Sequence, residues 1–269
     1  MTQVREQMFF ILGMFLVLGM QNSLAVVRRY IDGKRNSVDA LMVVASLAQL
    51  GDFLFLASFI GFQASAFGKN CYAGAVGGSV LYFVFQIVST TILIIRATIL
   101  LKGNMQLAAR IMGFLVLFAS VASNVIGTVQ ATAVIDADGF CSVDFDWHNT
   151  NNIAKYILTG LYAALLIAFM VPVAKHMSIL EGSNAAEKLR RIATSFGGRV
   201  SWAIIGFLLP VFFPYIFASS STFAGLQAVG FIIQNYFGLL AATIVDDSEK
   251  KEAKPDLAQK TSAMERGRV

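Results

Sequence analysis

The chain has 269 residues, of which 57% are hydrophobic and only 14% are charged. Soluble domains carry about a quarter charged residues, so this composition excludes an ordinary soluble protein and indicates an integral membrane protein. The apolar stretches are long and uniform, which excludes the alternating strands of a membrane β-barrel. The net charge of +5 does not indicate nucleic-acid binding, because the basic residues gather in segments on one side of the apolar stretches.

Seven apolar stretches predict an all-α bundle of seven transmembrane helices within residues 1–245, in which each helix satisfies its own backbone hydrogen bonds. Residues 246–269 are polar and carry both charges, so we expect a disordered cytoplasmic tail. In chain order the predicted spans are 7–27, 39–66, 73–101, 109–131, 152–174, 200–218 and 222–245.

The distribution of Lys and Arg predicts the orientation. With the N-terminus outside, 17 of the 21 basic residues fall in the cytoplasmic segments and the tail. Basic residues favour the cytoplasmic side, so we expect an outside N-terminus and a cytoplasmic C-terminus. The predicted location is the plasma membrane or another membrane of the secretory pathway.

Polar side chains interrupt the apolar spans. Asp52 lies 13 residues into the second span, near the middle of the bilayer, where a charge is costly unless it is paired or neutralised. Two interpretations stay open for Asp52: an ion or proton site, or a protonated carboxyl packed among polar side chains. Together with residues at similar depth it predicts an intramembrane polar layer, made of Asn22, Asp52, Gln86, Asn124, Gln234 and Asn235.

The third span has a cysteine just before one end and an arginine near the other. Cys71 precedes it and Cys141 lies in the loop after the fourth span, so both face outside, where a disulfide persists. We expect a bridge that clamps the loop over an outer pocket; two unpaired thiols are the alternative. Arg96 lies near the cytoplasmic end, and Asp39 opens the second span at a comparable depth. An Asp39–Arg96 pair would latch these ends, whereas a snorkelling arginine is the alternative.

The sixth span contains Pro210 and Pro214, each of which removes a helical hydrogen bond and favours a kink. The kink indicates a pocket wall or a hinge, or simply a bent packing helix. His148 and His176 lie on opposite sides of the membrane, so no metal site is expected. We find no catalytic constellation and expect no enzyme activity.

Several of these residues resemble the motifs of rhodopsin-like G-protein-coupled receptors. Asn22 falls where their first-helix asparagine stands, and SLAQLGD is similar to their second-helix motif, with Asp52 at the sodium-site position. Arg96 follows Cys71 by 25 residues, as does the arginine of their Asp-Arg-Tyr motif. In this resemblance the Cys71–Cys141 pair matches the disulfide pair of the receptors. Pro210 matches their sixth-helix proline, and Asn235 matches their seventh-helix asparagine.

A second resemblance is to the microbial rhodopsins. STTILII, LPVFF and NYFGLL are similar to segments of their third, sixth and seventh helices. This alignment puts Gln234 at the retinal-lysine position and Gln86 at the counter-ion position. Lys155 lies at the outer edge of the fifth span, so we expect no intramembrane lysine, no covalently bound retinal and no other cofactor.

Three functions follow as expectations. The first is a receptor that senses an extracellular or membrane ligand and signals through its cytoplasmic face. The second is a non-signalling scaffold that forms homo-oligomeric membrane assemblies. The third is a small transporter or channel that uses Asp52, Gln86 and Asn235. The expected partners are the lipid bilayer, a cytoplasmic signalling protein and further copies of the chain.

Overall fold

The protein is helical, with one small β-hairpin. The computed structural model describes residues 2–32, 37–61, 71–135, 141–144, 150–179, 184–216 and 233–241. A seventh helical segment covers residues 233–241. Each predicted span overlaps one of these seven helices, so the helical fold class is confirmed. The other six helices are α1 (Thr2–Asp32), α2 (Ser37–Gly61), α3 (Cys71–Ala97), α4 (Asn104–Gln130), α5 (Thr150–Ile179) and α6 (Asn184–Ile216).

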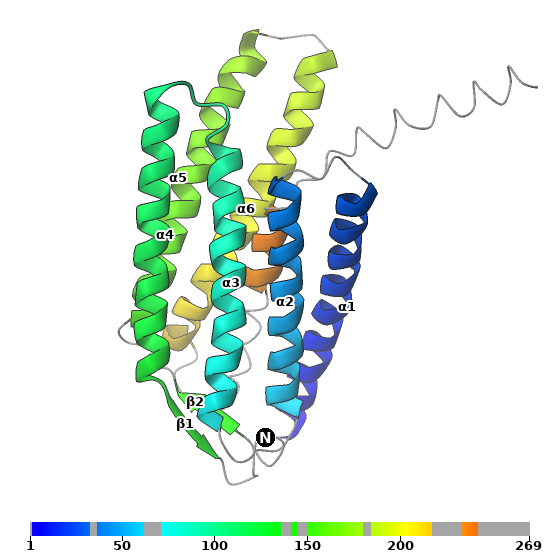
Figure 1. Cartoon of the computed structure of the whole chain (residues 1–269), viewed down its shortest axis with the longest axis vertical. Helices are drawn as coiled ribbons and strands as arrows, with labels where there is room; N and C mark the ends of the chain where they lie inside the picture. Colours follow the sequence, from blue (N-terminus) through cyan, green and yellow to red (C-terminus); the bar gives the residue numbers. More distant parts are fainter. Residues whose placement is uncertain are drawn as a thin grey trace, which may run out of the picture.

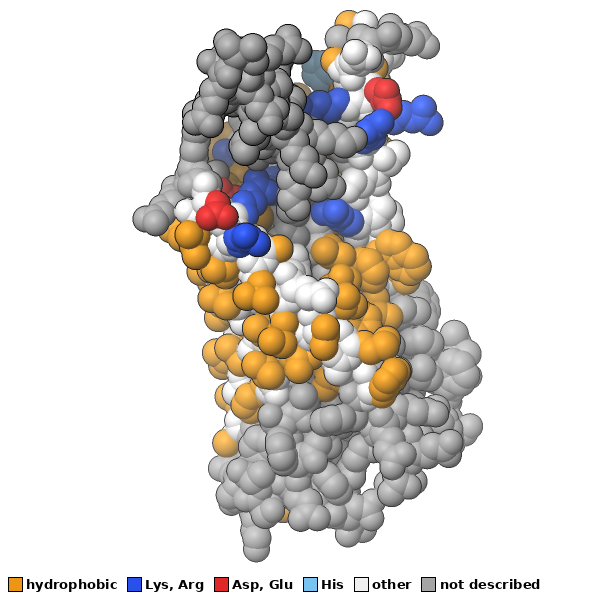
Figure 2. Space-filling model, turned by 90° about the vertical axis from the view of Figure 1, so that its right-hand side faces the viewer, with side chains coloured by type: hydrophobic (Ala, Val, Ile, Leu, Met, Phe, Trp, Pro, Cys, Tyr) orange, Lys and Arg blue, Asp and Glu red, His pale blue; other side chains and the backbone are white. Residues whose placement is uncertain are grey.

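Four helices among the described residues are long and apolar enough to cross a membrane: Ser37–Phe55, Cys71–Ala97, Asn104–Gln130 and Ile153–Ile179. Large apolar side chains such as Phe118, Leu115 and Val129 stand exposed on α4. On the face drawn in Figure 2, hydrophobic side chains cover the middle of the molecule, with Lys and Arg gathered above them. These features indicate an integral membrane protein, because such an apolar surface suits a hydrocarbon environment.

Helix α3 occupies the middle of the bundle. It packs against α2, α4 and α5, and its residues Ile92, Leu93 and Ile94 are almost fully buried (Figure 1). The hairpin also contacts α3. It is formed by β1 (Thr132–Ile135) and β2 (Cys141–Asp144), which pair antiparallel. The hairpin lies at the end of the bundle that holds the N-terminus, in a segment that the sequence predicted as a loop.

Helix α6 begins 16 residues earlier than the predicted sixth span, at Asn184 instead of Val200. Residues 184–199, which lie between the predicted fifth and sixth spans, are therefore helical. The Ala, Glu, Lys, Leu and Arg residues of this segment are good helix formers, and Ala193 and Phe196 are buried against the bundle. The Phe196 ring lies 4.2 Å from that of Phe169 on α5. A helix of 33 residues is about 50 Å long, so α6 outreaches a hydrocarbon layer of about 30 Å.

The helix over residues 233–241 lies very close to α6. A Cβ atom added to Gly206 would stand 2.7 Å from both the backbone nitrogen and the Cα atom of Gln234. No side chain fits in that space, so the glycine lets the two backbones touch. This contact holds the last described helix against α6.

We therefore expect Gly206→Ala to lower the stability of the protein by about 1–3 kcal/mol, the usual range for overpacking. The matched control is Gly198→Ala in the same helix, where an added Cβ meets nothing within 4 Å. Thermal unfolding of the purified protein in detergent measures the difference. Equal melting temperatures for the two variants would contradict the close backbone contact.

Candidate functional site: interior polar contacts and an arginine cluster

A buried hydrogen bond joins α2 to the helix over residues 233–241. The Nδ2 atom of Asn235 donates to the Oδ2 atom of Asp52 at 2.9 Å. One turn earlier on α2, the amide of Gln49 donates to the backbone oxygen of Asn235. The three residues are at most 3% exposed. A buried carboxyl group that lacked a partner would be costly, so these contacts fix where Asp52 can reside.

The same helix is joined to α3. The Nε2 atom of Gln234 donates to the hydroxyl oxygen of Tyr82 at 2.7 Å, and both side chains are buried. Gln234 and Asn235 are consecutive residues, so they point in different directions from one helix. The helix over residues 233–241 is therefore held by α3 through one residue and by α2 through the next.

A second group of polar contacts joins α3, α4 and α5. The Nδ2 atom of Asn124 donates to the Oε1 atom of Gln86 at 3.1 Å. The Nε2 atom of Gln86 donates to the hydroxyl of Ser120 at 3.3 Å, and this hydroxyl donates to the Ala154 carbonyl at 3.3 Å. The four residues form a continuous chain of hydrogen bonds across three helices. Thus α3 takes part in both groups of polar contacts.

Some buried polar atoms have no hydrogen-bond partner among the described residues. They include the Oε1 atom of Gln49 and the Oδ1 atom of Asn235. Gln49 contacts Asn235, and Asn235 contacts Asp52. Carbonyl and carboxylate oxygens are the groups that hard cations prefer. Both interpretations of Asp52, an ion or proton site and a structural hydrogen bond, are compatible with this arrangement. The Nδ2 atom of Asn22 also lacks a partner in the described part of the chain.

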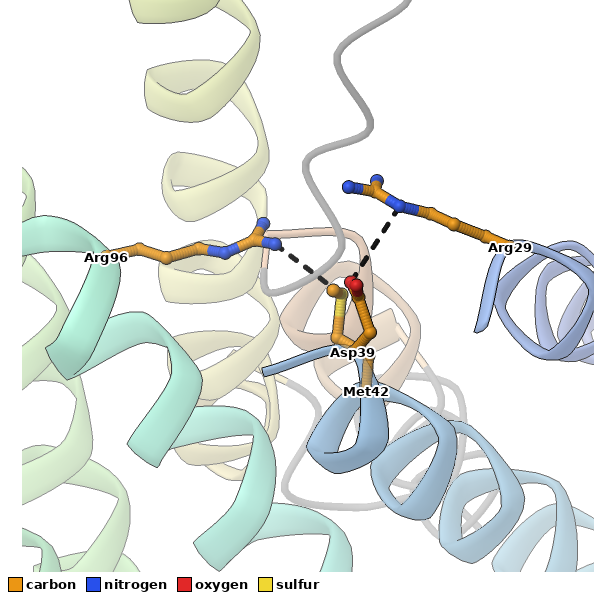
Figure 3. Close-up of polar contacts among 4 residues, drawn as sticks. All are labelled: Arg29, Asp39, Met42 and Arg96. Carbon is orange, nitrogen blue, oxygen red and sulfur yellow. Dashed lines mark hydrogen bonds and ion pairs between the residues drawn. The ribbon is translucent and has the colours of Figure 1, made fainter. Parts of the chain in front are cut away.

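Charged residues gather at the opposite end of the bundle from the hairpin. The Nε atom of Arg29 lies 3.8 Å from the Oδ1 atom of Asp39, whose side chain is only 11% exposed. The Nη2 atom of Arg96 lies 3.6 Å from the sulfur of Met42. Figure 3 shows the two guanidinium groups reaching from α1 and α3 toward Asp39 and Met42 on α2. Asp39 thus pairs with Arg29, a residue that the sequence did not single out, and the Asp39–Arg96 pair stays a prediction.

A third arginine belongs to this group. Arg199 on α6 donates from its Nη1 atom to the backbone oxygen of Leu240 at 3.0 Å. Arg29, Asp39 and Arg199 all lie close enough to Arg96 to act electrostatically on its guanidinium. We call Arg29, Asp39, Arg96 and Arg199 the arginine cluster. It joins α1, α2, α3, α6 and the helix over residues 233–241.

Cys71 begins α3 and is 4% exposed. Cys141 begins β2, which packs on α3, but its side chain is outside the described residues. The backbone arrangement brings the two segments together, and the pairing of the two cysteines stays a prediction. Positions 210 and 214 lie within α6, which continues as a helix to Ile216. The side chains of Pro210 and Pro214 are not described, so the predicted kink stays a prediction.

Lys155 lies at the start of the fifth span, as expected, but its side chain is buried. It lies two residues inside the candidate span Ile153–Ile179 and is only 8% exposed. Lys155 is the next residue after Ala154, whose carbonyl accepts the hydrogen bond from Ser120. A buried lysine therefore lies near the start of α5, and not at the position of Gln234.

Sequence reasoning missed several participants, and helical spacing was the available signal. Gln49 precedes Asp52 by three residues, Tyr82 precedes Gln86 by four, and Ser120 precedes Asn124 by four. Residues three or four apart share one face of a helix.

Neither the models of known protein families nor the curated proteins include a match to this chain.

We expect Tyr82→Phe to lower the stability by about 1–3 kcal/mol, because it leaves the buried amide of Gln234 without its acceptor. Tyr156→Phe is the matched control, since Tyr156 is 49% exposed on α5. Chemical denaturation in detergent measures both changes. If the two variants lose equal stability, the Tyr82–Gln234 hydrogen bond does not contribute as described.

Proposed function

We propose that the chain is a seven-span, receptor-like membrane protein with its N-terminus outside and its C-terminus in the cytoplasm. A ligand from the extracellular side or from the membrane binds in the outer half of the bundle, and the cytoplasmic face transmits the signal. The observation that supports this proposal best is the position of α3. One end of α3 contacts the hairpin, and the other end brings Arg96 into the arginine cluster.

The basic end of the molecule supports the proposed orientation. Arg29 and Arg96 lie in the last turns of α1 and α3, at the end of the bundle opposite the hairpin, and basic residues favour the cytoplasmic side of a membrane. The hairpin is then extracellular, where a Cys71–Cys141 bridge would be stable. Such a bridge would fasten the hairpin to the start of α3 above the ligand.

Polar contacts supply a route from the outer half to the cytoplasmic end. Ligand-dependent displacement of α3 acts on Gln234 through Tyr82 and on α4 through Gln86. The helix that carries Gln234 also meets Arg199 through the Leu240 carbonyl. A shift of this helix relative to α6 therefore changes the surroundings of Arg96.

One observation favours a second function, a transporter or channel. Asp52 is a buried carboxyl in a candidate span and is bonded to Asn235. The side-chain oxygens of Asn235 and of its partner Gln49 have no hydrogen-bond partner among the described residues. Acidic groups inside a membrane often mark ion or proton pathways. This alternative predicts that Asp52→Asn abolishes a flux, whereas the receptor needs no flux.

The test is basal nucleotide exchange on a set of heterotrimeric G proteins by the chain in nanodiscs. We expect Arg96→Gln to reduce the exchange rate at least tenfold, because the side chain at the cytoplasmic end of α3 is changed. Arg28→Gln is the matched control: Arg28 lies at the same end, but its side chain is 87% exposed and pairs with Asp32.

Equal exchange rates for Arg96→Gln and the unchanged chain would contradict signalling through Arg96. Absence of exchange, together with an ion flux into liposomes that Asp52→Asn removes, would instead support the transporter. Absence of both, together with a large homo-oligomer after mild solubilisation, would support the scaffold.

A further inference from the structure

Helix α1 lies at the edge of the bundle, where it packs against α2 (Figure 1). Its buried side, which includes Leu12, Ser23 and Val26, is turned toward the bundle. On the opposite side, exposed residues recur at alternating intervals of four and three. We call them the α1 face: Phe10, Met14, Val17, Gln21, Leu24 and Arg28. Residues at this spacing share one narrow side of a helix, which is the pattern by which two helices pack along each other.

Gln21 stands in the middle of the α1 face and at mid-depth of a candidate span. Two residues further on, the hydroxyl of Ser23 donates to the backbone oxygen of Ser46 at 3.1 Å. Ser46 is midway along the candidate span Ser37–Phe55, so Gln21 lies near the same depth. Gln21 is exposed, and its amide makes no hydrogen bond with another described residue. An amide that faces lipid at this depth is costly, because hydrocarbon offers it no partner.

Exposed polar residues are placed differently on the four candidate spans. In the described part of these helices they lie within five residues of an end, as do Asn104 and Gln130 at the two ends of α4. Between the ends of α4 the exposed side chains are apolar, for example Leu115 and Phe118. Contact with lipid therefore explains the surfaces of these four helices, but it does not explain the amide of Gln21.

We propose that the α1 face is an interface between two parallel copies of this chain, in which the two Gln21 amides hydrogen-bond to each other. Copies that insert in the same direction carry Gln21 at the same depth, so a twofold axis brings the two amides together. Each amide has both a donor and an acceptor, so a symmetric pair satisfies both residues. The pair requires α1 in the bilayer, and thus rests on the seven-span architecture of the proposed function, but it does not require signalling.

The ends of the α1 face are compatible with two copies. Phe10, Met14 and Leu24 offer large apolar side chains on either side of Gln21. At the charged end, Arg28 lies 3.7 Å from Asp32 of its own helix, so two copies bring together two neutral pairs and not two lone charges. A different membrane protein would have to carry a polar group at the same depth, which a second copy supplies by symmetry.

The dissociation constant of the pair in liposomes tests the proposal. Two preparations of the full chain, each with a different fluorescent protein after the C-terminus, are reconstituted together in phosphatidylcholine liposomes. Energy transfer between them is measured as the protein-to-lipid ratio is lowered. We expect Gln21→Leu to raise the dissociation constant about 3- to 20-fold, the range for one hydrogen bond between membrane helices. The matched control is Gln130→Leu, the same exchange at an exposed position at the end of α4.

A bulky side chain tests the interface without changing its polarity. Val17 is 53% exposed on the α1 face, and Val125 is 41% exposed on α4. We expect Val17→Trp to raise the dissociation constant at least about fivefold, because it prevents close approach of the two helices, whereas Val125→Trp leaves it unchanged. Thermal unfolding at low protein-to-lipid ratio should be the same for both variants, which separates loss of the pair from loss of the fold.

Three results would overturn the proposed pair. The first is a monomer at every protein-to-lipid ratio. The second is an equal dissociation constant for Gln21→Leu and Gln130→Leu, and the third is equal weakening by Val17→Trp and Val125→Trp.

Failure of the pair can be told apart from failure of the proposed function. Reaction of Leu24→Cys with a water-soluble thiol reagent in intact liposomes, beyond that of the unchanged chain, would place α1 outside the membrane and overturn the seven-span architecture together with the pair. Protection of Leu24→Cys in a chain that stays monomeric would overturn the pair alone. Nucleotide exchange in nanodiscs that each hold one copy needs no pair, so it tests signalling separately.

Discussion

A polar group in the interior of an apolar bundle must find its partner within the protein, because the hydrocarbon of a membrane offers none. The amides and hydroxyls on α3 follow this constraint in two directions. Gln86 and its neighbours join α3 to α4 and α5, whereas Tyr82 joins α3 to the helix over residues 233–241. The arrangement of the other helices around α3 therefore depends on a small number of buried hydrogen bonds.

The helix over residues 233–241 is positioned from three sides. Asn235 holds it to Asp52 on α2, Gln234 holds it to α3, and the absence of a side chain at Gly206 admits it to the surface of α6. At its end the Leu240 carbonyl is bound by Arg199. Hydrogen bonds in apolar surroundings specify position well, since any displacement leaves a buried polar group without a partner. For this reason a shift of this one helix would change both the interior hydrogen bonds and the contact with the arginine cluster.

Much of the fold was predictable from composition and hydropathy. All seven apolar stretches overlap helices, and five of the six residues expected in a polar layer make hydrogen bonds between helices. The spacing of Gln49 before Asp52, and of Tyr82 before Gln86, could have extended that set, since these pairs share a helix face.

Other features could not be read from the chain. The contact between Gly206 and Gln234 depends on how two distant helices approach each other. The pairing of Arg29 with Asp39 depends on the relative rotation of α1 and α2. The helical start of α6 was missed because hydropathy reports only its apolar part, while buried Ala193 and Phe196 extend its packing beyond that part. The burial of Lys155 likewise depends on what packs around α5 and cannot be judged from its position near the start of the span.

The Asp52–Asn235 hydrogen bond is the contact on which this account depends most, and exchanging its two residues tests it directly. Asp52→Asn, Asn235→Asp and the double exchange are compared by chemical denaturation in detergent. We expect Asn235→Asp alone to be the least stable, because two carboxyl groups then face each other. The double exchange should recover stability by at least about 1 kcal/mol beyond the sum of the single effects, as expected for residues in contact. If the two effects simply add, within about 0.5 kcal/mol, the two side chains do not interact and the described interior is contradicted.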